Sequence, residues 1–125
     1  MKKPSSPKER NLLKACIRRV FSRSELRQHA MLTTRIEHFD PERPRVTKWS
    51  FCLECGTIEP TYKMEADHAE PLIPVNSSLE DMTWDEVVDR AWCELENLRP
   101  VCKPCHKLKT RLEGQERRRL KKERA

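Results

Sequence analysis

Two pairs of cysteines with metal-ligand spacing are the first chemistry that the sequence offers. Cys52 and Cys55 form one C-x-x-C pair and Cys102 and Cys105 form the other, with 46 residues between the pairs. Four thiolates can bind one zinc ion tetrahedrally, which leaves no open position for a substrate. The sequence therefore predicts a structural zinc site. Such sites occur in enzymes, binders and scaffolds alike, so the cysteines alone indicate no activity.

A second group of residues carries the chemistry that hydrolysis of a phosphodiester requires. Asp67 and His68 are adjacent, and His106 directly follows the last cysteine. Histidine can take a proton from water near neutral pH, so His68 is the candidate general base. Asp67 offers a hard oxygen ligand on the opposite side of the strand, and His106 can complete a site for one divalent ion. Such an ion would absorb charge on the phosphate and on the leaving oxygen.

In their order and spacing these residues resemble the HNH endonuclease family. The shared features are Asp67-His68 at a strand end, two prolines soon after it, Asn97 followed by leucine, and a cysteine pair running directly into His106. Eight residues separate Asn97 from His106, as is usual in the family, and the resemblance covers residues 49–112. The long segment between His68 and Asn97 departs from the family pattern.

The resemblance implies a fold and a reaction. The fold would be a ββα-metal (His-Me finger) core, and the reaction would be hydrolysis of DNA with one Mg²⁺ or Mn²⁺ ion and His68 as base. Asn97 would either orient the base through its side-chain amide or, as in some relatives, bind the metal. Small members are common in bacteriophages and mobile elements, so we expect the cytoplasm of a bacterial or phage-infected cell. A phage or host protein that docks on the basic arms is a further expected partner.

Charge is segregated along the chain. Residues 1–48 carry a net charge of +8, residues 49–97 carry −10 and residues 98–125 carry +8. Basic ends suit phosphate contacts with DNA, and an acidic centre suits cation binding, although solvated helix faces would also explain the blocks. We expect the phosphate contacts around the last helix to come from Arg99, Lys103, Lys107, Lys109 and Arg111.

The alternative is a non-catalytic zinc-ribbon module that binds nucleic acid or a protein through its basic arms. It explains the cysteines and the charge equally well, but it gives no reason for Asp67-His68 or for the spacing from Asn97 to His106. No apolar run is long enough for a membrane span, so we expect a soluble protein without a membrane partner. A length of 125 residues with 37% charged residues allows one small core with helical attachments.

Three parts are expected: a basic α-helical arm over residues 1–48, a small α+β HNH core with the zinc site over 49–112, and a basic extension over 113–125. In the arm, Ser6 as N-cap and Pro7 at the first helical position predict a helix, with Cys16 on its apolar face. Ser22 is the expected cap of a second helix, which would continue through Ile36. Asp40, Pro41 and the following residues end the helical pattern.

The core should contain a hairpin, an inserted helix and a final helix. Short β-prone pieces around Cys52 predict a zinc knuckle, with Gly56 at positive φ. Thr83 and Glu86 form a capping box for a helix whose apolar stripe should be buried; it comprises Trp84, Val87, Val88, Ala91, Trp92 and Leu95. The last helix should begin near Pro104 and run to Gly114. The remaining cysteines, histidines and nearby carboxylates are expected to be structural: buried thiols at Cys16 and Cys93, packed or surface imidazoles at His29 and His38, and solvated side chains at Glu70 and Glu96.

Overall fold

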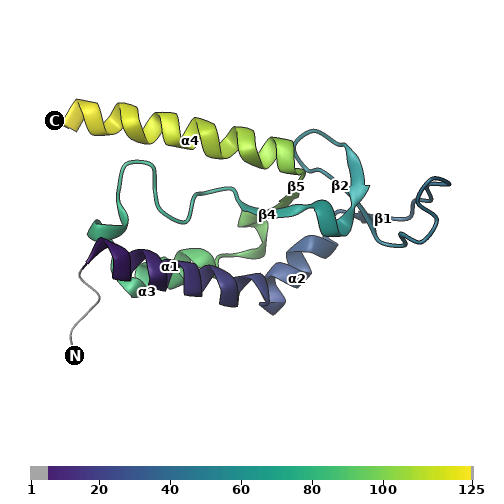
Figure 1. Ribbon diagram of the computed structural model, residues 1–125, viewed down its shortest axis with the longest axis horizontal. Helices are drawn as coiled ribbons and strands as arrows, with labels where there is room; N and C mark the ends of the chain where they lie inside the picture. The colour runs from purple at the N-terminus through teal and green to yellow at the C-terminus, as the bar shows by residue number, and fades with distance from the viewer. Residues whose placement is uncertain (1–5, 125) are drawn as a thin grey trace.

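A computed structural model describes residues 6–124. The first five residues of the expected N-terminal arm, and Ala125 of the expected extension, lie outside the described residues. In the described part, four α-helices combine with two small antiparallel sheets (Figure 1), which confirms a small α+β fold. In chain order the elements are α1 (Pro7–Ser22), α2 (Glu25–Leu32), β1 (Arg35–Ile36), β2 (Trp49–Phe51), β3 (Ile58–Pro60), β4 (Glu65–His68), α3 (Trp84–Ala91), β5 (Leu98–Val101) and α4 (Lys103–Arg124).

The first helix starts where the sequence predicts, but the second does not. Ser6 caps α1 by accepting a hydrogen bond from the Glu9 backbone N–H. The N-cap of α2 is Ser24, not Ser22, and the helix ends at Leu32. Residues 35–36 instead form β1, which pairs with β2. The expected helix through Ile36 is therefore wrong, because β-sheet pairing outcompetes a helical pattern that contains β-branched residues.

The buried face of α1 is narrower than its apolar pattern. Phe21 is buried and Leu13 and Ile17 are half-buried, whereas Cys16 and Val20 are exposed. The expected burial of the Cys16 thiol is therefore wrong. The six apolar residues between positions 12 and 20 cover too wide an arc of the helix to face one neighbour, and α1 packs through the side that contains Phe21.

The first cysteine pair lies at the end of a hairpin, where the sequence predicts a zinc knuckle. Strands β2 and β3 pair antiparallel, Phe51 opposite Ile58, and the first cysteine pair lies in the turn between them. Gly56 has φ of 78°, a left-handed conformation that residues with a Cβ rarely adopt. The prediction of a positive φ at this position is confirmed.

Helix α3 has the predicted start and a shorter course. Thr83 and Glu86 form the reciprocal capping box. The helix ends at Ala91, and only part of its apolar stripe is buried: Val87 and Ala91 are buried, but Val88, Trp92 and Leu95 are 41%, 37% and 36% exposed. The prediction of a fully buried stripe is wrong for these three residues. Two of them, Trp92 and Leu95, lie beyond the end of the helix and therefore no longer share its face.

Strands β4 and β5 and helix α4 form one structural unit. The strands pair antiparallel, with Asp67 opposite Arg99 and His68 opposite Leu98. Helix α4 follows β5 directly and continues ten residues past the expected end at Gly114. It lies on one side of the β4–β5 pair, while α1, α2 and α3 lie on the other (Figure 1). The long segment between the two strands carries α3.

Two apolar clusters join the N-terminal helices to the rest of the chain. One comprises Met31 of α2 with Cys52, Met64, Val101 and Cys102. In the other, Phe21 and Ala30 pack against Ala91 and Leu98, with the half-buried Cys93 beside them. The helical arm is therefore part of the same core as β4 and β5. Over residues 6–124, every helix is too short or too polar to cross a lipid bilayer.

Candidate zinc centre and catalytic site

The four cysteines of the two pairs meet at one point. Their Sγ atoms all lie within 4.8 Å of one another, and those of Cys55 and Cys102 are 3.7 Å apart. Zinc–sulfur bonds of about 2.3 Å in a tetrahedron place the sulfur atoms about 3.8 Å apart, so this cluster has the dimensions of a Cys₄ site. It can hold a metal ion such as zinc. The site links the β2–β3 turn to the junction of β5 and α4.

The environment of the thiols favours partial ionisation. A hydrogen bond between the Thr57 hydroxyl and the Cys55 sulfur, 3.1 Å apart, lowers the pKa of Cys55 to about 6. Burial opposes ionisation of Cys52, but backbone N–H groups, including those of Cys102 and Cys55, hydrogen-bond its sulfur and lower its pKa. The neighbouring thiols of Cys102 and Cys55 raise the pKa of Cys105. A cluster that concentrates negative charge in this way attracts a cation.

Asp67 is the buried acidic group of the predicted catalytic set. Its side chain is 5% exposed, and each of its oxygens contacts a cation. Arg99 donates to Oδ2 over 3.3 Å and Lys109 donates to Oδ1 over 3.2 Å. Arg99 also pairs with Glu54, and Lys109 with Glu113. Buried carboxylates are normally paired in this way, because an isolated buried charge is very costly.

His106 lies beside the same carboxylate. Its Nε2 atom is 3.9 Å from Asp67 Oδ1. Two ligands that each bind an ion over about 2.1 Å can be up to about 4.2 Å apart, so this pair is within the span of one divalent ion. A cleft of about 400 Å³ opens next to Asp67 and is lined by Arg99, Lys109 and Glu113 among others. The donor set for a divalent ion at this place is thus one oxygen and one nitrogen.

His68 points to the other face of β4, as strand alternation predicts. Its ring packs against Phe21, with centroids 5.1 Å apart, and its Nε2 lies 3.0 Å from the carbonyl oxygen of Ala91. A carbonyl only accepts hydrogen bonds, so Nε2 must carry the proton. In the neutral imidazole Nδ1 then keeps a free lone pair, which is the state that a general base needs.

Asn97 holds the backbone that follows His68. Its Oδ1 accepts a hydrogen bond from the Glu70 N–H over 2.8 Å, and its own carbonyl accepts one from the Ala69 N–H over 2.8 Å. These two hydrogen bonds therefore position the strand end that carries His68, and neither is made with the imidazole. Glu70 and Glu96 are exposed.

The five basic residues expected to contact phosphates fall into two groups. Arg99 and Lys109 are engaged with Asp67, and their side chains are only 26% and 25% exposed. Lys103, Lys107 and Arg111 are exposed on α4. Sequence reasoning missed Glu54 and Glu113 as members of the Asp67 network. For Glu113 a signal existed, because its i,i+4 spacing from Lys109 is that of an ion pair on a helix.

Comparisons of the chain with protein-family models, with curated proteins and with solved structures found no match. Its function therefore has to be inferred from the chemistry of its own residues.

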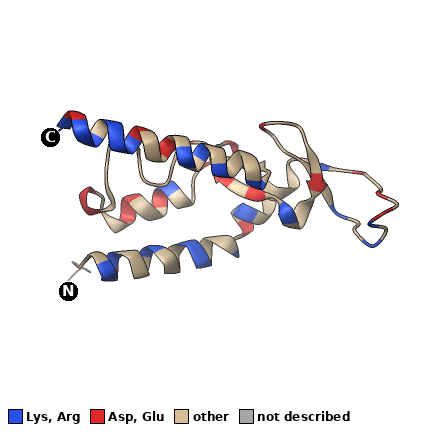
Figure 2. Cartoon of the chain, turned by 45° about the horizontal axis from the view of Figure 1, so that its top comes forward, with Lys and Arg blue, Asp and Glu red and all other residues tan. Residues whose placement is uncertain are grey.

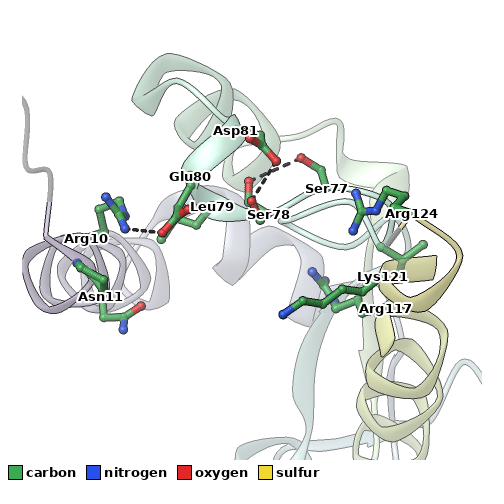
Figure 3. A pocket seen from close by; sticks show the side chains of 12 residues that line it. Arg10, Asn11, Ser77, Ser78, Leu79, Glu80, Asp81, Arg117, Lys121 and Arg124 are labelled. Atoms are coloured by element: carbon green, nitrogen blue, oxygen red, sulfur yellow. Dashed lines mark hydrogen bonds and ion pairs between the residues drawn. The ribbon is translucent and has the colours of Figure 1, made fainter. Parts of the chain in front are cut away.

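A second cleft lies beside the C-terminal half of α4. It has a volume of about 700 Å³ and lies between the start of α1, residues 75–81 and the end of α4 (Figure 3). Arg117 donates to the carbonyl of Ile73, and Arg124 donates to that of Asn76. These bonds fasten α4 to the segment between β4 and β5. The basic C-terminal extension, as far as Arg124, is accordingly a continuation of α4 that is hydrogen-bonded to this segment.

Proposed function

We propose that the chain is a zinc-stabilised HNH endonuclease that hydrolyses DNA phosphodiesters. The observation that carries this proposal is the β4–β5–α4 unit, in which Asp67 and His106 approach to 3.9 Å on one face of β4 while His68 occupies the other face. All three side chains lie near the end of β4, and the proposed reaction requires that a phosphate at this end reach both His68 and the Asp67–His106 pair. The zinc cluster lies at the opposite end of the β4–β5 pair and braces it.

The chain's own residues would divide the reaction as follows. His68, with Nε2–H held by the Ala91 carbonyl, accepts the proton of the attacking water at Nδ1. Asn97 keeps the strand end and therefore the imidazole in position. Asp67 and His106 would hold a divalent ion such as Mg²⁺ or Mn²⁺, which supplies charge stabilisation at the phosphate and the leaving oxygen. The zinc cluster would take no part in bond cleavage.

Helix α4 offers a surface for the DNA backbone. Lys and Arg recur along it (Figure 2), and four of them share one face at helical spacing: Lys107, Arg111, Arg118 and Lys122. These four are exposed, and among the described residues they have no hydrogen-bond or ion-pair partner. The acidic residues of α4 lie on the opposite face, paired with Lys109 and Arg119. The four cations span about 22 Å of helix, enough for several phosphates of one strand.

Gly114 lies on the same face of α4, between Arg111 and Arg118. Glycine in a helix interior costs about 1 kcal/mol relative to alanine. A Cβ here would meet only the Arg118 Nη1 atom at 3.6 Å, so packing does not require glycine. A residue without a side chain does allow a ligand backbone to approach the helix closely. Gly114 therefore supports the assignment of this face to nucleic acid.

The proposal is tested by incubating the purified protein with supercoiled plasmid and Mg²⁺ or Mn²⁺. We expect nicked or linear DNA, and no cleavage in EDTA under conditions in which zinc is retained. His106→Ala should weaken binding of the divalent ion, and excess Mn²⁺ should restore part of the cleavage activity. Absence of cleavage with every divalent ion, in a protein that holds zinc and binds DNA, would contradict the proposal.

The second candidate is a non-catalytic zinc module that binds nucleic acid. It is favoured by one observation, the occupation of both Asp67 oxygens by Arg99 and Lys109, because such pairing makes Asp67 a structural anchor. The two candidates differ in the role of His68. A binder would show no cleavage in the wild type, whereas the nuclease would cleave DNA and lose that activity in His68→Ala.

A further inference from the structure

The ammonium group of Lys109 is enclosed by three oxygen atoms. Its Nζ atom lies 3.2 Å from Asp67 Oδ1, 2.6 Å from the His68 carbonyl oxygen and 2.6 Å from Glu113 Oε1. The contacts to Asp67 and His68 are hydrogen bonds, and the contact to Glu113 is an ion pair. Two carboxylates and a carbonyl are also the oxygen types that bind hard cations. The surroundings of Nζ are therefore those of a cation site built mainly from oxygen.

The ammonium contacts the same oxygen that His106 approaches. Asp67 Oδ1 lies 3.2 Å from Lys109 Nζ and 3.9 Å from His106 Nε2, whereas Oδ2 faces Arg99. A divalent ion bonded to Oδ1 and to His106 would stand about 2.1 Å from Oδ1. A second positive charge on the same oxygen would repel it strongly in so buried a place. The ion and the ammonium therefore compete for Oδ1.

Charge balance supports exchange of one cation for the other. Asp67, Glu54 and Glu113 supply three negative charges, and Arg99 and Lys109 supply two positive charges. A divalent ion that replaced the ammonium at Oδ1 would leave this network neutral if Lys109 moved out to solvent. Lysine is suited to such a movement, because its charge sits on a flexible four-carbon stem.

We infer that Lys109 is a resident cation that occupies Asp67 Oδ1 and must be displaced when a divalent ion binds there. This inference rests on the proposed divalent-ion site. It assigns to Lys109 a role in setting the affinity and selectivity of that site, in place of the phosphate contact that the sequence suggests. A divalent ion should bind Asp67 more tightly when Lys109 is absent, because it then does not have to break the contact between the ammonium and the carboxylate.

The test measures Mn²⁺ binding to the zinc-loaded protein by isothermal titration calorimetry. Lys109→Met removes the ammonium and should lower the Kd for Mn²⁺ at least about tenfold. Lys107→Met is the matched control, because it removes the same charge from the outer face of the same helix and should change the Kd less than about threefold. Equal Kd values for wild type and Lys109→Met would overturn the inference and leave the proposed ion site intact.

A second measurement needs no variant and so does not depend on how Lys109→Met folds. Acetylation by a lysine-specific reagent, followed by peptide mass spectrometry, reports the accessibility of each amine. Lys109 should be protected without Mn²⁺ and become several-fold more reactive at saturating Mn²⁺, while Lys107 stays unchanged. Unaltered protection at saturation would overturn the inference. If Mn²⁺ binds to neither wild type nor Lys109→Met, the ion site and the inference both fail; if it binds but plasmid is not cleaved, only the proposed function fails.

Discussion

Replacement of Cys102 by serine should unfold the part of the chain that the zinc site holds together. Structural zinc sites contribute about 10–16 kcal/mol of apparent binding energy, against a total stability of about 5–15 kcal/mol for a typical domain. Apart from two of the ligands, the apolar cluster at the site consists of Met31, Met64 and Val101. Burial of three such side chains supplies roughly 5–9 kcal/mol before the entropy of ordering is subtracted. The cluster cannot replace the metal.

We therefore expect Cys102→Ser to lose zinc and to lower Tm by at least about 10 °C, or to abolish a cooperative transition. The assays are metal analysis of the purified protein and thermal unfolding followed by circular dichroism. Cys16→Ser is the matched control, because that thiol is exposed on α1 and lies outside the cluster, so Tm should change by less than about 2 °C. A Cys102→Ser variant with wild-type Tm and one zinc per chain would refute the reasoning.

The same site should respond to acid. Zinc ligands must be deprotonated, so protons compete with the metal. The pKa of Cys55 is lowered from its ordinary value of 9.0 to about 6. A pKa lowered by folding gives stability that is present above the unfolded value and is lost as the pH falls through the folded value. Cys55 should be the last of the four thiols to be protonated, and Thr57→Val should make a zinc-release titration shift to higher pH.

Three further predictions concern Asn97 and helix α4. Asn97→Ala should reduce kcat for plasmid cleavage more than it weakens DNA binding, while Asn97→Asp, which keeps the acceptor oxygen, should restore part of the activity; a loss of binding alone would contradict the positioning role. Arg118→Gln combined with Lys122→Gln should reduce the slope of log affinity against log salt by about 1.8, whereas Arg119→Gln, whose guanidinium is already paired, should leave it nearly unchanged. Gly114→Ala should stabilise the protein by up to about 1 kcal/mol in urea unfolding yet weaken DNA binding; unchanged affinity would exclude close approach of DNA at this position.

Local signals in the sequence predicted the features that depend on neighbouring residues. The cap at Ser6, the capping box at Thr83 and the left-handed Gly56 each follow from residues within a few positions. The opposite orientations of Asp67 and His68 follow from the alternation of side chains along a strand. The meeting of the two cysteine pairs follows from the geometry that a tetrahedral ion imposes on four thiolates.

Features that depend on which face meets which neighbour could not be predicted in this way. Cys16 and Phe21 both belong to the apolar pattern of α1, and only contact with α3 and β5 selects the side that contains Phe21. Lys109 has the same sequence character as Lys107. Its ammonium is enclosed because α4 packs over β4 and brings it to Asp67, 42 residues earlier in the chain. No local pattern distinguishes a lysine that contacts phosphate from one that neutralises a buried carboxylate.

The most direct test of the account compares His68→Ala with His29→Ala in cleavage of supercoiled plasmid. Both substitutions remove one imidazole, but His29 is exposed on α2, whereas His68 lies at the end of β4 with its Nε2 on the Ala91 carbonyl. Loss of a general base should reduce the cleavage rate about 10²–10⁴-fold in His68→Ala, with zinc content, fold and DNA affinity retained, and should leave His29→Ala at the wild-type rate. Cleavage by His68→Ala at the wild-type rate, in a preparation free of contaminating nuclease, would contradict the proposed catalytic role of His68, whereas absence of cleavage by the wild type would favour the zinc-dependent binder.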